Sequence, residues 1–160
     1  MLEALLGGVF VLAGTALGSV LERRATRSHT AAAGLAAHRQ EAREAIAALV
    51  SALSAHRGDL YERWTLAHRP AVTEAQTEQA RHTSHASRRT VTHALYRLRV
   101  LTTDPELLRA ATEAVGATYA VKVKGEALAD ITEQDLAGRH RRATAADDAL
   151  LTTCATRLAP

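Results

Sequence analysis

The first stretch of the chain is almost wholly apolar. No charged residue lies between Ala4 and Leu21, and a Glu-Arg-Arg sequence follows at once. A helix of about 18 residues, rising about 1.5 Å per residue, is about 27 Å long, close to the thickness of a bilayer's hydrocarbon core. The pattern therefore predicts a transmembrane or anchor helix over residues 1–24 and a helical bundle domain over residues 25–160.

Beyond this stretch, apolar residues recur at spacings of three and four, which is the period of a helix. No proline interrupts the pattern before Pro70, so we expect one long helix, or two nearly continuous ones, ending near Ala67. Its apolar seam is of the coiled-coil type. The seam consists of Leu21, Ala25, Ser28, Ala32, Leu35, Ala42, Ile46, Leu49, Leu53 and Leu60, and Arg39, His56 and Arg63 interrupt it.

Three more helices are expected after Pro70. The first covers about residues 71–102, and the second begins at Pro105 behind a capping Asp104 and continues to about Ala129. The last begins behind Thr132, where a Thr-Glu-Gln-Asp sequence resembles a capping box. Short connections between long helices imply antiparallel neighbours. The expected fold is all-α, with the N-terminal transmembrane helix continuing into a long helix of an antiparallel cytoplasmic bundle of about four helices.

Composition limits the chemistry of this bundle. Hydrophobic residues make up 47% of the chain, but aromatic residues make up only 3%. Such a chain suits a thin seam between helices rather than a deep pocket. It contains no glycine-rich phosphate loop, nucleophile elbow or obvious carboxylate pair, so we expect no enzyme and no cofactor. The single cysteine, Cys154, excludes an intramolecular disulfide and fits a reducing cytoplasm.

The charges around the apolar stretch predict its orientation. Arg23, Arg24 and Arg27 follow it, and the positive-inside rule then places the C-terminal domain in the cytoplasm of a single-pass protein of the cell membrane. A buried core helix rich in glycine and alanine is one alternative. A cleaved signal peptide is another, but the N-terminus carries Glu3 with no lysine or arginine, and no typical cleavage site follows.

Small residues of the apolar stretch share one helix face. Gly7, Gly14 and Gly18 lie on it together with Ala4 and Val11. Glycines four residues apart let membrane helices pack closely. This face predicts packing between membrane helices and a homo-oligomer.

The sharpest charge asymmetry lies between residues 79 and 103. This segment has no acidic residue and five arginines, namely Arg81, Arg88, Arg89, Arg97 and Arg99. Three interpretations stay open: a solvated face, contact with anionic lipid, or binding of nucleic-acid phosphates such as those of DNA. The lack of aromatic residues disfavours recognition of single strands. Residues 139–142 form a smaller basic cluster with the same ambiguity.

Other polar and aromatic residues are given structural roles. His82, His85 and His93 share a helix face with Glu78, and a metal site there is the alternative to a solvated or packing role. No Glu-x-x-His pair of the di-iron type is present, and we predict no metal. We expect Tyr61 and Trp64 to fix the tip of the hairpin around Pro70, and Cys154 to be a small buried apolar residue.

Three local sequences, at residues 45–57, 61–64 and 84–91, carry a resemblance to a known family. They read AIAALVSALSAHR, YERW and SHASRRTV. With the N-terminal apolar helix and its basic stop, the chain resembles the KilB-like plasmid-spread membrane proteins of Streptomyces and relatives. The resemblance implies a membrane protein that assists transfer or spread of a conjugative element, and it offers no catalytic residues.

Two functional hypotheses follow. The first is a non-enzymatic, membrane-anchored helical protein that acts by self-association or by binding a partner protein of a transfer apparatus, as an accessory of plasmid conjugation. The second is a membrane-associated module that binds the DNA backbone through the basic helix over residues 79–103.

Overall fold

The computed structural model describes the backbone of residues 2–159 and the side chains of residues 33–159. All the regular elements of the described chain are helices, which confirms the all-α prediction. It divides into two compact units, Met1–Arg39 and Gln40–Pro160. The helices are α1 (Leu2–Ala67), α2 (Glu74–Leu101), α3 (Pro105–Tyr119), a short 3-10 helix η1 (Leu128–Asp130) and α4 (Glu133–Arg157).

The first unit holds the early part of α1. The side chains of the predicted anchor, including Gly7, Gly14 and Gly18, lie outside the described residues. Within the described part of the chain, none of the helices combines the length and the apolar character that crossing a bilayer requires. The membrane span and the domain boundary after residue 24 therefore stay predictions.

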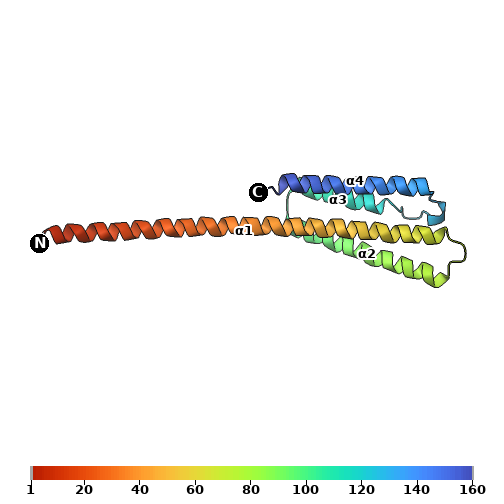
Figure 1. The fold of residues 1–160 in the computed structure, drawn as a ribbon, viewed down its shortest axis with the longest axis horizontal. Helices are drawn as coiled ribbons and strands as arrows, with labels where there is room; N and C mark the ends of the chain where they lie inside the picture. The colour runs from red at the N-terminus through yellow and green to blue at the C-terminus, as the bar shows by residue number, and fades with distance from the viewer. Residues whose placement is uncertain (1, 160) are drawn as a thin grey trace. The chain divides into compact units, whose positions relative to one another are not determined.

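The second unit is a bundle of four helices. The last part of α1, then α2, α3 and α4 run alternately in opposite directions, as the short connections predict (Figure 1). The end of α1 near Ala67 is as expected. The structure confirms this antiparallel bundle within Gln40–Pro160.

Leucine, isoleucine and alanine fill the centre of the bundle. Ile46, Leu49 and Leu53 of α1 are at most 1% exposed, as the predicted seam requires. Ala111 and Ala114 of α3 are fully buried in the same cluster, where their small side chains let neighbouring helices approach closely. Leu35, which the seam also included, is 60% exposed. Among the seam positions whose side chains the structure describes, Ala42 is the first that is buried, just after the four-helix unit begins at Gln40.

Side-chain caps fix where three helices begin. Asp104 accepts hydrogen bonds from the backbone N–H groups of Glu106 (2.9 Å) and Leu107 (3.1 Å), which confirms the predicted start of α3. Thr132 accepts from the N–H of Asp135 at 3.1 Å, which confirms the start of α4. The start of α2 is later than predicted, because Thr73 forms a capping box with Gln76 and the helix begins at Glu74.

The prediction that the second of these three helices continues to Ala129 is wrong. The α3 helix ends at Tyr119, and Gly125 has a φ of +88°, a left-handed conformation that favours glycine. Arg139 of α4 holds this connection by two hydrogen bonds to Glu126, of 2.6 and 2.7 Å. These bonds lower the pKa of Glu126 to about 2. The local composition after Tyr119 favours a helix, but Gly125 and the ion pair between Arg139 and Glu126 stabilise a non-helical connection instead.

Trp64 stacks on His68 of the hairpin around Pro70, with ring centroids 4.3 Å apart, and it also holds the connection before α4. Its indole Nε1 donates a 2.7 Å hydrogen bond to the backbone oxygen of Ile131. Trp64 packs against a second, smaller apolar cluster formed by Leu60, Val121, Ile131, Leu136 and Ala143. The indole therefore ties the end of α1 to the segment before α4.

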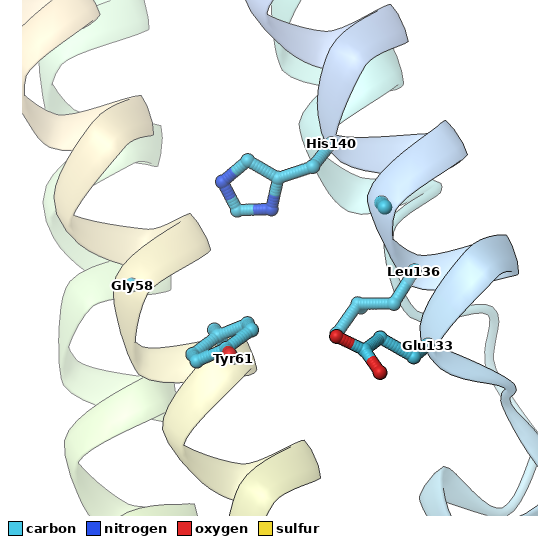
Figure 2. Close-up of a pocket in the computed structure, with 6 residues that line it drawn as sticks. Gly58, Tyr61, Glu133, Leu136 and His140 are labelled. Carbon is cyan, nitrogen blue, oxygen red and sulfur yellow. The ribbon is translucent and has the colours of Figure 1, made fainter.

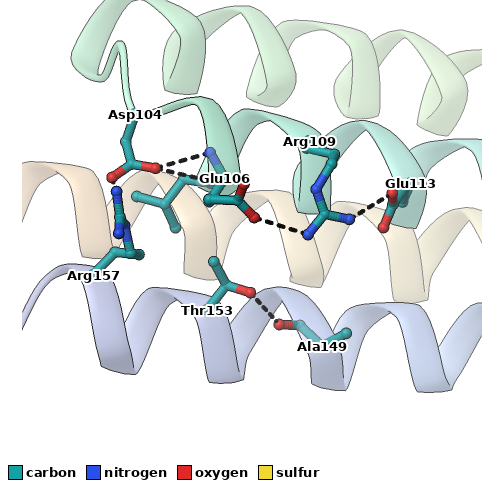
Figure 3. A network of polar contacts seen from close by, with 8 residues as sticks. Asp104, Glu106, Arg109, Glu113, Ala149, Thr153 and Arg157 are labelled. Carbon is teal, nitrogen blue, oxygen red and sulfur yellow. Dashed lines mark hydrogen bonds and ion pairs between the residues drawn. The ribbon is translucent and has the colours of Figure 1, made fainter.

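An ion pair joins the opposite end of α3 to α4. Arg157 Nε donates a 2.7 Å hydrogen bond to Asp104 Oδ2, and this bond lowers the pKa of Asp104 (Figure 3). Arg109 pairs with both Glu106 and Glu113 along the exposed side of α3 (Figure 3). Asp104 is thus both the cap of α3 and its tie to the last turn of α4.

Candidate polar sites of the bundle

The basic face of α2 is the first candidate. All five predicted arginines are exposed on α2. At about 100° of rotation per residue, they spread over about half of the helix circumference. The basic face comprises Arg81, Arg88, Arg89, Arg97 and Arg99.

Few of these charges are neutralised within the described part of the chain. Arg81 lies 3.5 Å from Glu78 in an exposed pair. The guanidinium of Arg88 stacks over the ring of Tyr119 at 4.3 Å, and that of Arg99 lies 5.9 Å from the ring of Tyr96. Stacking leaves the positive charge in place, so the basic face retains charge for an anionic partner.

The histidines considered as an alternative metal site do not gather into one group. His82, His85 and His93 are exposed on α2. Among the described residues, no group of three or more His, Cys, Asp or Glu side chains could hold a metal ion. Cys154 is partly buried against the main apolar cluster, and burial raises the pKa of its thiol, which makes it a poorer nucleophile.

Sequence reasoning missed a buried ion pair at the centre of the bundle. Arg57 of α1 donates a 2.7 Å hydrogen bond to Asp147 Oδ2 of α4 and a 3.0 Å bond to Thr118 Oγ1 of α3. The residues Arg57, Asp147 and Thr118 are at most 5% exposed. Burial raises the pKa of Asp147, while the hydrogen bond from Arg57 opposes that rise. This triad connects three helices through one guanidinium.

A second polar seam lies between α1 and α2. His56 Nδ1 is 2.9 Å from Ser87 Oγ, and the Ser87 hydroxyl donates to the backbone oxygen of Ser84 at 3.1 Å. Because that hydroxyl proton is already used, His56 Nδ1–H donates to Ser87 and the ring carries its free electron pair on Nε2. Arg63 donates in the same way to Ser84 Oγ at 3.1 Å. His56 and Arg63 were visible in the sequence only as interruptions of the apolar seam.

The pKa of His56 makes the stability of the bundle depend on pH. Burial is the main cause that lowers this pKa from 6.5 to about 4; Asp59 opposes this shift, and the charges of Arg88, Arg63 and His85 contribute to it. The unfolded chain therefore takes up this proton below about pH 6.5 while the folded chain does not, so stability falls as the pH falls from about 6.5 to about 4.

We expect His56→Gln to weaken this pH dependence. Urea unfolding of the full chain at pH 7 and pH 4.5, followed by the fluorescence of its single tryptophan, measures the effect. The exposed His93→Gln serves as the matched control and should leave the slope as in the parent chain. An equal loss of stability on acidification in the His56 variant and the parent would contradict the assignment.

An open groove lies between α1 and α4. It has a volume of about 390 Å³ and is lined by Gly58 and Tyr61 on one side and Glu133, Leu136, Ala137 and His140 on the other (Figure 2). Tyr61 is 51% exposed at its edge. Burial and the nearby Arg57 lower the pKa of His140, so this imidazole is neutral at pH 7. The groove is mostly apolar.

The basic cluster over residues 139–142 is divided by the structure. Arg139 is engaged by Glu126, whereas Arg141 and Arg142 are exposed. The cluster therefore does not act as one surface, because its first arginine holds the connection before α4.

Comparison with known proteins identifies the class of protein. Residues 43–158, which cover nearly all of the bundle, match the KilB plasmid transfer protein family. The chain belongs to this family, and the resemblance seen in the sequence is confirmed. It is 35% identical over 157 residues to Protein KilB of Streptomyces lividans, with 98% of each chain covered. No solved structure matches the chain.

Proposed function

We propose that this plasmid transfer protein is a non-enzymatic accessory that is anchored in the cell membrane by its N-terminal helix and acts by assembly. The observation that carries the proposal is the uncharged sequence from Ala4 to Leu21 with Arg23, Arg24 and Arg27 behind it. By the positive-inside rule, the bundle then lies in the cytoplasm, where it can meet a partner protein of the transfer apparatus.

The bundle supports an assembly role rather than catalysis. Its buried polar groups are used to join helices, as the contacts of Arg57, His56 and Arg63 illustrate. Exposed apolar side chains, among them Tyr61 and Tyr96, are available for contacts with other proteins.

The first test of this proposal measures whether the chain self-associates through the glycine face of its N-terminal helix. We expect Gly14→Leu combined with Gly18→Leu to lower the sedimenting mass of the full chain in detergent, because leucine keeps the helix backbones apart. Gly8→Leu, which changes a neighbouring glycine off that face, is the matched control. Unchanged sedimentation of the double variant would remove assembly through this face.

DNA is the second candidate partner, favoured by the exposed basic face of α2. The full chain in detergent should then retain duplex DNA with an affinity that falls steeply with salt, by about 0.9 log units per log unit of salt for each phosphate contacted. Arg89→Gln and Arg97→Gln should each lower this slope by about one. Arg109→Gln, which changes an arginine already paired on α3, is the control. Retention that does not change with salt would exclude this candidate.

A further inference from the structure

A small cavity with an unusual charge lies where α1, α2 and the end of α3 meet. Its volume is about 50 Å³. Arg63, Arg88 and Lys122 line it together with Ser84, His56 and Tyr119. His56 and Ser84 are buried, whereas Arg88 is exposed, so the cavity has a polar floor and a positively charged mouth.

No carboxylate lines this cavity. Among the described residues, Arg63, Arg88 and Lys122 take part in no ion pair. Like charges that lie near one another without a counterion repel, and the repulsion is stronger where part of the surroundings is protein rather than water. Two acids act on these groups without lining the cavity. Asp59 raises the pKa of His56, and Lys122 lowers the pKa of Glu126, whose carboxylate is already paired with Arg139.

The positive charges around the cavity also lower the pKa of His56. The charges of Arg88 and Arg63 and the neighbouring His85 all lower the pKa of His56, in addition to burial. The imidazole on the floor is therefore neutral at pH 7. An anion in the cavity would reverse this electrostatic effect and raise the pKa of His56.

Hydrogen-bond donors remain for such an anion. A guanidinium has five N–H donors and an ammonium has three. Arg63 uses one on Ser84, and Lys122 donates at 3.1 Å to the backbone oxygen of Val123. The ring of Tyr119 lies between Arg88, which stacks on it at 4.3 Å, and His56, whose ring centre is 5.7 Å away. This packing limits the freedom of Arg88 and so reduces the entropy lost on binding.

The volume selects the class of ligand. A single water needs about 10–15 Å³ of such space, so the 50 Å³ here has room for a group of a few heavy atoms but not for a nucleotide. Two guanidinium groups and an ammonium suit a compact dianion with several acceptor oxygens, and phosphate is the common anion of that kind.

We propose that this cavity binds one phosphate group, as the free inorganic ion or as the phosphate end of a small monoester. Arg63, Arg88 and Lys122 neutralise its charge, and its oxygens accept hydrogen bonds from their N–H groups. The bound phosphate joins α1, α2 and the connection after α3. This inference is independent of membrane anchoring and of DNA binding.

Calorimetric titration of the full chain in detergent with inorganic phosphate, at constant ionic strength, tests the proposal. We expect saturable binding of one phosphate per chain, weakened at least tenfold by Arg63→Gln and by Lys122→Gln. Arg97→Gln, which removes an equal charge from α2 outside the cavity, should change the affinity less than twofold. Glycerol 3-phosphate in a parallel titration distinguishes a monoester from the free ion as the preferred form.

Two cavity variants, Arg63→Gln and Lys122→Gln, are used so that the test still gives a result if one of them misfolds. Arg63 bonds to Ser84 in the helix seam, whereas Lys122 bonds only to its neighbour in the chain, and tryptophan fluorescence verifies that each variant is folded. As a second readout, phosphate should raise the pKa of His56 above about 4 in the parent chain. Absence of saturation with both ligands, or equal weakening by Arg97→Gln, would overturn the proposal.

Discussion

Replacing Asp147 with alanine is expected to lower the free energy of unfolding of the bundle by about 3–5 kcal/mol. The carboxylate accepts a 2.7 Å hydrogen bond from Arg57, and both side chains are at most 7% exposed. Without it, a guanidinium stays buried among helices with no counter-charge, and water cannot solvate it. Urea unfolding of the full chain in detergent, followed by tryptophan fluorescence, measures the loss.

Two further variants separate the ion pair from a general effect of charge. Asp148→Ala removes the neighbouring, exposed carboxylate and should leave the unfolding midpoint unchanged. Arg57→Met combined with Asp147→Leu should recover most of the stability, since apolar replacement of both partners leaves no buried charge. A loss for Asp147→Ala no larger than for Asp148→Ala would show that the pair does not hold the bundle together.

Helix positions followed from the sequence because their causes are local. The spacing of Ile46, Leu49 and Leu53 and the caps Asp104 and Thr132 act within a few residues, and the structure confirms each of them. The end of α3 was missed because its cause is not local. Arg139 contacts Glu126 from 13 residues away, and no period in the sequence records that pair.

The buried ion pair left a signal that could have been used. Arg57 falls at seam spacing between Leu53 and Leu60, and Asp147 falls in the same way between Ala143 and Leu150. Two opposite charges on the apolar faces of different helices indicate a buried pair, because an isolated charge there is too costly. Their separation of 90 residues meant that only the topology of the bundle could bring them together.

The sequence predicted that α2 carries a basic segment, but not that its arginines have different surroundings. Sequence alone treats Arg88 and Arg97 as equivalent charges. Both are exposed in the structure, but Arg88 lies at the cavity against Tyr119 and Arg97 lies outside the cavity. The partner side chains, which lie on other helices, decide which arginine has a specific role.

If residues 1–24 anchor the chain in the membrane, removing residues 1–21 should change where the protein is found. Removing residues 1–21 takes away the uncharged segment and leaves the bundle, its caps and its ion pairs intact. The truncated chain should therefore move from the membrane fraction to the soluble fraction, while its tryptophan fluorescence stays that of a folded protein. Attaching an unrelated single-pass helix in place of residues 1–21 should return it to the membrane.

The most direct measurement is extraction of membranes from cells that produce the full chain. If the N-terminal helix anchors the chain, the protein stays with the lipid after washing with high salt and alkaline carbonate, and is released only by detergent. A full-length chain that is soluble and monomeric without detergent would contradict this anchoring.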